Sequence, residues 1–290
     1  MFMAVGSLVV IAAVVGGFMW EGGRLGALLQ PAEFLIIGGA AAGSVLISTP
    51  TKILVLGLAQ LRKLLSSEYG KAQYLQLLGM LYQLFKVIQQ SGIMALEDHV
   101  EEPEKSSVFT KFPGFLARRD ALDFLSDTVK VIMAGGIAPH DLETLMNEDV
   151  DIHREEALKP SQALMKVGDA LPGLGIVAAV LGVVITMAHI DGPPEEIGEK
   201  VGAALVGTFL GILLSYGFAQ PLAQKLEHEV MEETHYLQCI KTGLFAAFRG
   251  FPPAIAIEFA RRVVPGDVRP TFDETEQACR GTAHAESAAA

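Results

Sequence analysis

Four stretches of this chain are long enough and apolar enough to cross a lipid bilayer, and they constrain the fold more than any other feature. A hydrocarbon core about 30 Å thick requires roughly 20 apolar residues of helix. The stretches cover residues 1–20, 34–51, 171–190 and 201–223, and the last two contain no Asp, Glu, Lys or Arg. The sequence therefore predicts an all-α integral membrane protein with four transmembrane helices and a mostly helical cytoplasmic domain.

The rest of the chain is polar enough to lie in water. Of the 290 residues, 51% are apolar and 19% are charged, which places the chain between a soluble domain and one buried wholly in lipid. A net charge of −11 argues against nucleic acid as a partner. Cys239 and Cys279 lack the spacing of a disulfide framework or a zinc site. No catalytic motif is visible, so the sequence predicts neither an enzyme nor a cofactor.

Basic residues predict the orientation in the membrane. The short loops after the first and third stretches contain only Arg24 and Lys200, whereas 20 of the 22 Lys and Arg residues lie in residues 52–170 and 224–290. The positive-inside rule places both of these large regions, and with them both termini, in the cytoplasm.

Five parts are expected along the chain. They are residues 1–51, with two membrane helices and a short periplasmic loop; 52–170, a helical cytoplasmic domain; 171–223, with two more membrane helices; 224–273, a helical extension; and 274–290, a disordered tail. Within the cytoplasmic domain, glycines predict the ends of two helices, at Gly92 and at Gly135. A third helix is expected to open near Pro139, and the fourth membrane helix is expected to continue into water.

Small residues crowd the third and fourth stretches, which lets their backbones approach closely. Gly207 and Gly211 have GxxxG spacing, a pattern that helix packing alone also explains. Pro172 is expected at the start of the third membrane helix, where proline is tolerated. Pro221 falls late in the fourth and should loosen its hydrogen bonding, either as a passive kink or as a hinge.

Ionisable side chains buried in a membrane usually mark an ion path, and these four stretches contain no Asp, Glu, Lys or Arg. Thr208 and Tyr216 offer only hydroxyl groups, which can orient a carboxylate but cannot carry a proton down a potential. If the protein works in an ion-driven machine, the carrier carboxylate must therefore come from another chain.

Several long motifs resemble one family. They are LPGLGIVAAVLGVV followed by VGTFLGILLSYGFAQPLA, with QPAEFLIIGGAAAG, ALEDHVEEP and FPPAIAIEFARRVV elsewhere in the chain. In this order they closely resemble the A subunits (MotA) of bacterial flagellar motor stators. The resemblance implies a pentamer of this chain around two B subunits (A5B2) in the bacterial inner membrane. The B subunit would supply an essential membrane aspartate, and protons moving past it would turn the A ring, which pushes on the rotor protein FliG.

The resemblance also assigns roles to residues in the membrane. Pro172 and Pro221 match two prolines implicated in coupling ion movement to conformational change, and Thr208 matches the threonine that faces the B-subunit aspartate. Ala179 and Gly207 stand where sodium-driven members place threonines. Because alanine and glycine side chains offer no oxygen ligands, these departures favour protons as the coupling ion.

On the rotor side, Glu97 matches the family's acidic contact with FliG. Gln89 replaces the matching basic residue, which puts the usual charge pairing in question. Lys86 lies three residues earlier on the same helix face and is a substitute, with a solvated lysine as the plainer interpretation. Further candidates are Arg118, Arg119, Asp120 and Asp123, for which a plain surface charge cluster is the alternative interpretation.

Two other functions stay open at this point. One is a subunit like ExbB or TolQ that energises outer-membrane processes, although those relatives usually have three membrane helices. The other is a non-conducting membrane scaffold, whose small-residue helices serve only to oligomerise.

Overall fold

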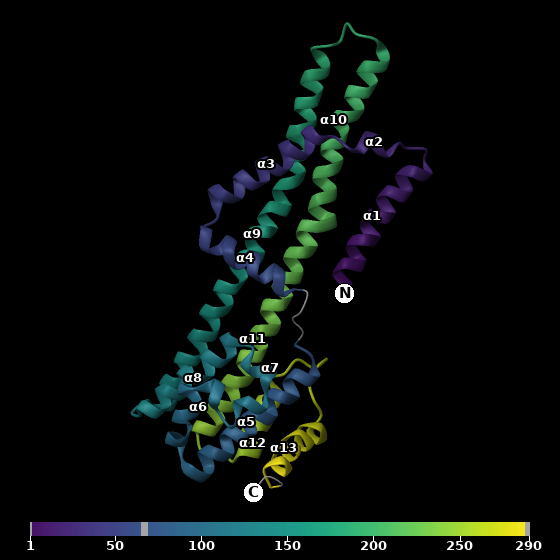
Figure 1. Ribbon diagram of the computed structural model, residues 1–290. Coiled ribbons are helices and arrows are strands. Elements are labelled where there is room, and N and C mark those ends of the chain that lie inside the picture. The colour runs from purple at the N-terminus through teal and green to yellow at the C-terminus, as the bar shows by residue number, and fades with distance from the viewer. Residues whose placement is uncertain (1, 65–68, 288–290) are drawn as a thin grey trace. The chain divides into compact units, whose positions relative to one another are not determined.

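The computed structural model describes residues 2–64 and 69–287, and within those ranges it is helical and has no strand (Figure 1). The elements in chain order are α1 (Phe2–Trp20), α2 (Leu25–Leu28), α3 (Pro31–Ser48), α4 (Thr51–Lys63), α5 (Lys71–Ser91), η1 (Ile93–Leu96), α6 (Glu97–Glu101), η2 (Pro103–Lys105), η3 (Phe109–Lys111), α7 (Pro113–Leu116), α8 (Arg119–Ala134), α9 (Pro139–Met187), α10 (Pro194–Leu214), η4 (Ser215–Ala219), α11 (Gln220–Phe248), α12 (Pro253–Arg262) and α13 (Phe272–Ser287). Element η4 is a π-helical turn, and the other η elements are 3₁₀ turns.

Four helical segments are long and apolar enough to span a membrane, which confirms the predicted fold class. They are α1, α2 with α3, α9, and the run from α10 through α11. Few of their apolar side chains are covered by the chain itself, and the apolar window of α1 has no buried residue. Lipid or further protein chains must cover this surface, because water solvates it poorly.

The chain divides into two compact units. Unit 1 consists of Met1–Ser67 and Ala157–Glu229, and unit 2 of Glu68–Glu156 and Val230–Ala290. The boundaries expected at residues 51, 170 and 223 mark where the chain enters and leaves the membrane, so the division into units does not test them.

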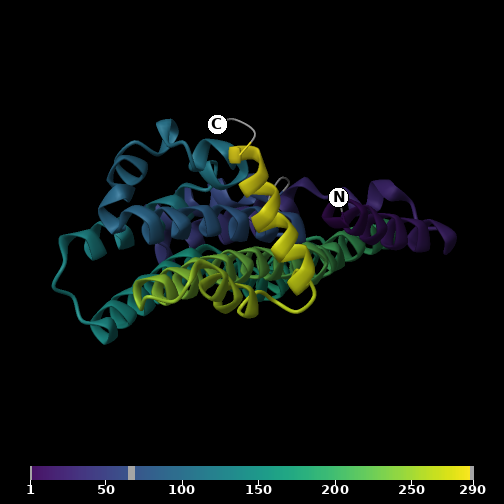
Figure 2. The same cartoon turned by 90° about the horizontal axis from the view of Figure 1, so that it is seen from below.

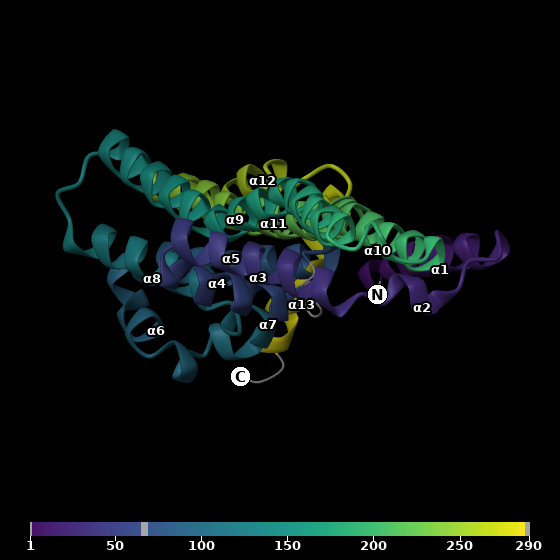
Figure 3. The same cartoon turned by 90° about the horizontal axis from the view of Figure 1, so that it is seen from above.

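In unit 1, α9 and α10 lie side by side (Figures 1 and 3). The α9 glycines Gly168, Gly175 and Gly182 recur every seven residues, or about two helical turns, and so share one face. A Cβ atom on Gly175 would lie 2.7 Å from the carbonyl oxygen of Gly207, and one on Gly182 would lie 3.0 Å from the Cα of Ala204. Only glycine fits at such approaches, so the small residues predicted to pack do form the interface between the two helices.

Helix α3 packs against α10 in the same unit. Its buried residues are Glu33, Ile37 and Ala41, which recur every four positions and therefore form one stripe along the helix. Ile37 and Ala41 join Leu171, Ala178, Val206 and Leu210 in the apolar core of the unit.

Unit 2 has a larger apolar core, to which α5, α8, α11 and α12 contribute. The predicted ends of α5 and α8 are confirmed, because Gly92 and Gly135 follow these helices with positive φ angles of 80° and 75°. Helix α11 also continues well past the fourth apolar stretch, as expected.

The disordered tail expected from residue 274 is wrong as far as Ser287, because α13 occupies Phe272–Ser287. A capping box starts this helix: Thr271 Oγ1 accepts from the Glu274 amide at 3.2 Å, and Glu274 Oε2 accepts from the Thr271 amide at 2.7 Å. Cys279 is buried in the core of unit 2, and α13 lies against α5 (Figure 2). Residues 288–290 lie outside the described part of the chain.

The expected position of Pro172 at a helix start is also wrong. Helix α9 continues without a break from Pro139 to Met187, so Pro160 and Pro172 both lie inside it. An interior proline costs about 3 kcal/mol, because it has no amide hydrogen and crowds the carbonyl four residues earlier. The helix therefore needs compensation near Pro172, which unit 1 provides.

Candidate functional site

The candidate site lies where α9 crosses α10, and it contains three of the residues singled out in the sequence. A Cβ atom on Gly207 would lie 3.2 Å from the amide nitrogen of Ala179. The Cα of Thr208 would lie 3.3 Å from a Cβ atom on Gly175. Thr208 and Ala179 are both half-buried. The structure thus brings Ala179, Gly207 and Thr208 to one helix crossing, while their roles toward an ion stay predictions.

A hydrogen bond between the two helices compensates for Pro172. Because Pro172 lacks an amide hydrogen, the carbonyl of Gly168 has no helical donor four residues later. The Ser215 hydroxyl donates to this carbonyl oxygen at 2.6 Å, and Ser215 is fully buried. Beside it, Gln220 Nε2 donates to Asp169 Oδ1 at 3.0 Å. Sequence reasoning missed Ser215, although a hydroxyl residue facing an interior proline is a usable signal.

Ser215 is also the first residue of the π-helical turn η4, which ends two residues before Pro221. In this turn the Gln220 amide donates to the carbonyl of Ser215, five residues back. A proline removes a helical hydrogen bond, and a π-turn is one way for a helix to absorb that loss. The expected loosening near Pro221 therefore takes the form of this turn. Ser215 links it to Pro172, so the two prolines share one local structure.

Tyr216 is 62% exposed within the chain. Pro221 is exposed as well, and Pro172 is half-buried. These three predicted residues thus keep surfaces that a neighbouring chain or lipid can contact.

Glu33 corrects the expectation that no ionisable group is buried in the membrane part of this chain. Because α3 begins at Pro31 rather than at Phe34, Glu33 lies within the helix, and its side chain is only 7% exposed. Its Oε2 atom would lie 2.5 Å from a Cβ atom on Gly207, so the carboxyl group occupies the space that this glycine leaves. The sequence showed an acidic residue next to the second apolar stretch, but not that it faces α10.

The predicted rotor-contacting residues lie in unit 2. Gln89 is exposed near the end of α5, and Glu97 is exposed as the first residue of α6. Lys86 is half-buried, with its ammonium group 5.8 Å from the centre of the Tyr82 ring. Part of its surface is therefore committed to packing, while the rotor roles of all three residues stay predictions.

The charge cluster after α7 is not simply a solvated surface. The guanidinium group of Arg118 stacks over Tyr69 and Tyr236, at 4.0 and 5.1 Å from the ring centres. Arg119 forms an exposed ion pair with Glu104 at 2.7 Å. Arg118 therefore contributes to the packing of unit 2, because a guanidinium over aromatic faces gains cation–π stabilisation.

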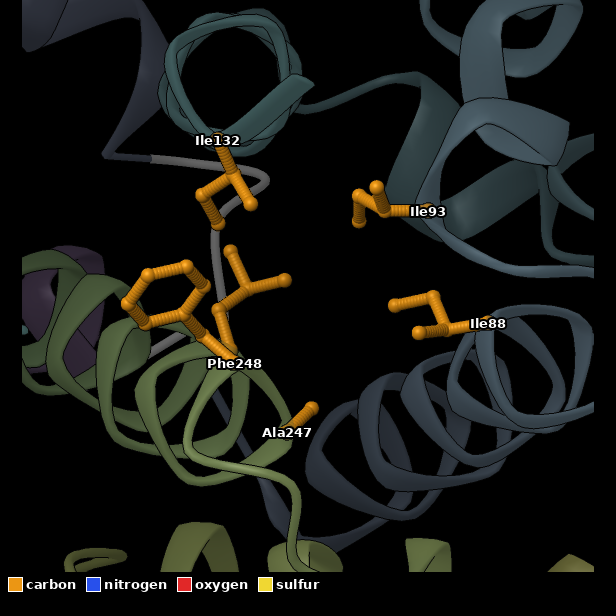
Figure 4. A pocket seen from close by; sticks show the side chains of 6 residues that line it. Ile88, Ile93, Ile132, Ala247 and Phe248 are labelled. Atoms are coloured by element: carbon orange, nitrogen blue, oxygen red, sulfur yellow. The ribbon is translucent and has the colours of Figure 1, made fainter. Parts of the chain in front are cut away.

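Other features of the described residues offer little chemistry. Unit 2 has an apolar cavity of about 250 Å³, into which side chains from α5, η1, α8 and α11 point (Figure 4). It is lined by Ile88, Ile93, Ile132, Leu244, Ala247 and Phe248. Across residues 2–64 and 69–287, no group of three His, Cys, Asp or Glu side chains is placed to hold a metal ion.

Two family models match this chain. Residues 4–92 match the model of the motility protein A N-terminal region, and residues 120–239 match that of the MotA/TolQ/ExbB proton channel family. The four spanning helices and the glycine-packed pair therefore belong to a membrane protein that is similar to the MotA/TolQ/ExbB proton channel family.

Within that class the relatives are more specific. Motility protein A of Salmonella typhimurium is 42% identical over 282 residues, covering 97% of this chain and 95% of the relative. The chain belongs to the motility protein A family. Solved structures share the fold: C. jejuni MotAB matches with a TM-score of 0.75 at 18% identity, covering 93% of this chain and 98% of the other. The flagellar MotAB stator complex of Bacillus subtilis matches at 0.68 and 22%, covering 88% and 92%.

Proposed function

We propose that this chain is the A subunit of a flagellar motor stator, which with a B subunit forms a proton-conducting complex and converts ion flow into torque on the rotor. The observation that carries the proposal is the joined arrangement at the α9–α10 crossing. Thr208 and Ala179 lie at a glycine-packed interface, and the Ser215 hydrogen bond links the two prolines next to it. Membership of the motility protein A family supports the same function.

The energy available from one ion suits this arrangement. An elementary charge crossing the membrane delivers about 2.3 kcal/mol per 100 mV. A hydrogen bond such as that from Ser215 to Gly168 contributes about 0.5–1.5 kcal/mol net. The passage of one ion can therefore break and remake the bond that links the prolines, without any nucleotide.

Protons are the coupling ion that fits the crossing best. Sodium has to exchange part of its hydration shell for several protein oxygen ligands. Ala179 and Gly207 supply no side-chain oxygen, and the carbonyl of Gly207 faces Gly175 of the other helix. Besides the Glu33 carboxyl group over Gly207, Thr208 offers a hydroxyl group at this level, which suits the orientation of a carboxylate.

The partners follow from this function. A MotB-like subunit supplies the membrane aspartate, five copies of this chain surround two of that subunit, and unit 2 contacts FliG in the cytoplasm. The exposed apolar surface of the spanning helices supports further chains around this one. The distribution of Lys and Arg supports both termini in the cytoplasm and a place in the inner membrane.

The test is swimming speed in a host that lacks its own stators and expresses this chain with its cognate B subunit. We expect motility that does not depend on sodium at fixed proton-motive force, and that is lost with Pro172→Ala. Pro160→Ala is the matched control, since it removes the other interior proline of α9 and should leave motility intact.

Other results would change the assignment. Motility that follows the sodium concentration would overturn the choice of ion. No rescue at all, with both subunits present in the membrane, would favour the ExbB- or TolQ-like function. Equal motility with and without Pro172 would show that Pro172 is not needed to couple ion flow to rotation.

A further inference from the structure

Glu33 is buried, and its Oε2 atom has no hydrogen-bond partner among the described residues. It belongs to the packing stripe of α3 with Ile37 and Ala41, so it points at α10 rather than at lipid. Its side chain is 7% exposed, and among the described residues Oε2 accepts no hydrogen bond. Acidic side chains are rarely buried in this way unless they have a use.

The surroundings of the carboxyl group are apolar. A Cβ atom on Gly207 would lie 2.5 Å from Glu33 Oε2, 3.1 Å from the Cβ of Ala178 and 3.2 Å from the amide nitrogen of Ala179, so these four residues meet at one point. Residues 171–187 of α9, 201–214 of α10 and 34–48 of α3 contain no Asp, Glu, His, Lys or Arg. The short helix α2, which also contacts α10, has no charged residue, and Arg24 precedes it. No opposite charge on these segments is therefore available to hold a permanent carboxylate.

We propose that Glu33 is a proton-exchanging group of this subunit, placed behind Thr208 on the ion path. This inference rests on the proposed function, because it adds a site to the same path. Binding forms one O–H bond on a carboxylate oxygen and neutralises the group. Release returns the proton to water or to the carboxylate of the B subunit, and no electrons are transferred.

Because Glu33 lies against Gly207, the residue before Thr208, a change in its protonation affects the part of α10 that carries this threonine. Gly207 and Thr208 are consecutive, and the carboxyl group fills the space over Gly207. A neutral carboxylic acid packs at this apolar crossing, whereas a carboxylate demands water or a cation there. The charge on Glu33 therefore acts on the same turn of α10 that presents Thr208 to the B subunit.

The experiment uses the purified complex of this chain with its B subunit. Infrared difference spectra between high and low pH should show a carboxylic acid band that shifts in D₂O, is lost in Glu33→Gln and moves in Glu33→Asp. Proton flow into vesicles should fall by about tenfold or more in Glu33→Gln and recover partly in Glu33→Asp. Glu195→Gln is the matched control, since Glu195 is exposed at the start of α10 and should leave band and flow unchanged.

A spectrum that Glu33→Gln leaves unchanged, or a flow within about twofold of the wild type, would overturn the proposal. If the Glu33→Gln complex does not assemble, the spectrum of Glu33→Asp tests the proposal instead. A carboxylic acid band that does not move in Glu33→Asp cannot belong to residue 33. The spectra need no rotation. A titrating Glu33 in a complex that drives no motility would reject only the stator function, and a rotating complex without the Glu33 band would reject only this inference.

Discussion

A single residue, Ser215, contributes to the local structure around both Pro172 and Pro221. Ser215 donates to the carbonyl that Pro172 leaves without a helical donor, and it also begins the π-turn that precedes Pro221. At the residue scale, then, Ser215 contributes near both prolines, through its hydroxyl group at Pro172 and through its backbone carbonyl in the turn before Pro221.

Ser215→Ala should therefore destabilise the complex. It leaves the Gly168 carbonyl buried without a donor, which costs about 1–3 kcal/mol. Thr186→Ala is the control, because Thr186 is also fully buried and its hydroxyl donates to Gly182 at 2.8 Å, a carbonyl that the helix already bonds. Thermal unfolding in detergent should show a clearly larger loss for Ser215→Ala. Equal losses would mean that Ser215 does not compensate for Pro172.

At the scale of elements, the sequence was sufficient to predict a helix or its end where hydrophobic periodicity or a helix-ending glycine determines the structure. It predicted the four spans and the ends of α5 and α8, because apolar length and positive-φ glycines are local properties. It failed at α9, where the local rule about Pro172 was overridden by Ser215 from another helix. It failed at Glu33 because the direction of a side chain depends on packing between α3 and α10. The prediction failed at α13 because it was based on the polar, Ala-rich composition of the tail and overlooked the capping box that the sequence contains at Thr271 and Glu274.

A second prediction concerns the start of helix α13. Its capping box should contribute about 1 kcal/mol to the stability of the helix, so Thr271→Ala should loosen α13. In the native chain, burial raises the pKa of the Cys279 thiol to about 12, so little thiolate forms at neutral pH. The rate of alkylation at Cys279, followed by mass spectrometry of its peptide, should rise severalfold in Thr271→Ala. Thr144→Ala is the control, as Thr144 is an exposed hydroxyl residue on α9; an unchanged rate at Cys279 in Thr271→Ala would show that the cap does not hold α13 in place.

At the scale of the whole molecule, a single chain does not form a complete ion path. Its spanning helices leave most of their apolar surface uncovered. Its own buried carboxyl group, Glu33, lies against Gly207 rather than in a continuous row of acids.

Vesicles that contain only this chain should therefore conduct protons far more slowly than vesicles that contain it with its B subunit. A pH-sensitive dye inside the vesicles measures both rates under the same imposed gradient. Equal rates would show that this chain carries the proton without a partner, and would assign the essential carboxylate to the A subunit itself.

The close fit of Glu33 over Gly207 also bears on how ion preference can change. Placing threonines at positions 179 and 207 would add the oxygen ligands that sodium needs, but a side chain at position 207 would collide with a carboxyl oxygen only 2.5 Å from its first atom. A change of ion in this background thus also requires the end of the Glu33 side chain on α3 to move aside. The residues that set ion preference are therefore distributed over α3, α9 and α10, and the effect of a threonine at position 207 depends on where Glu33 goes.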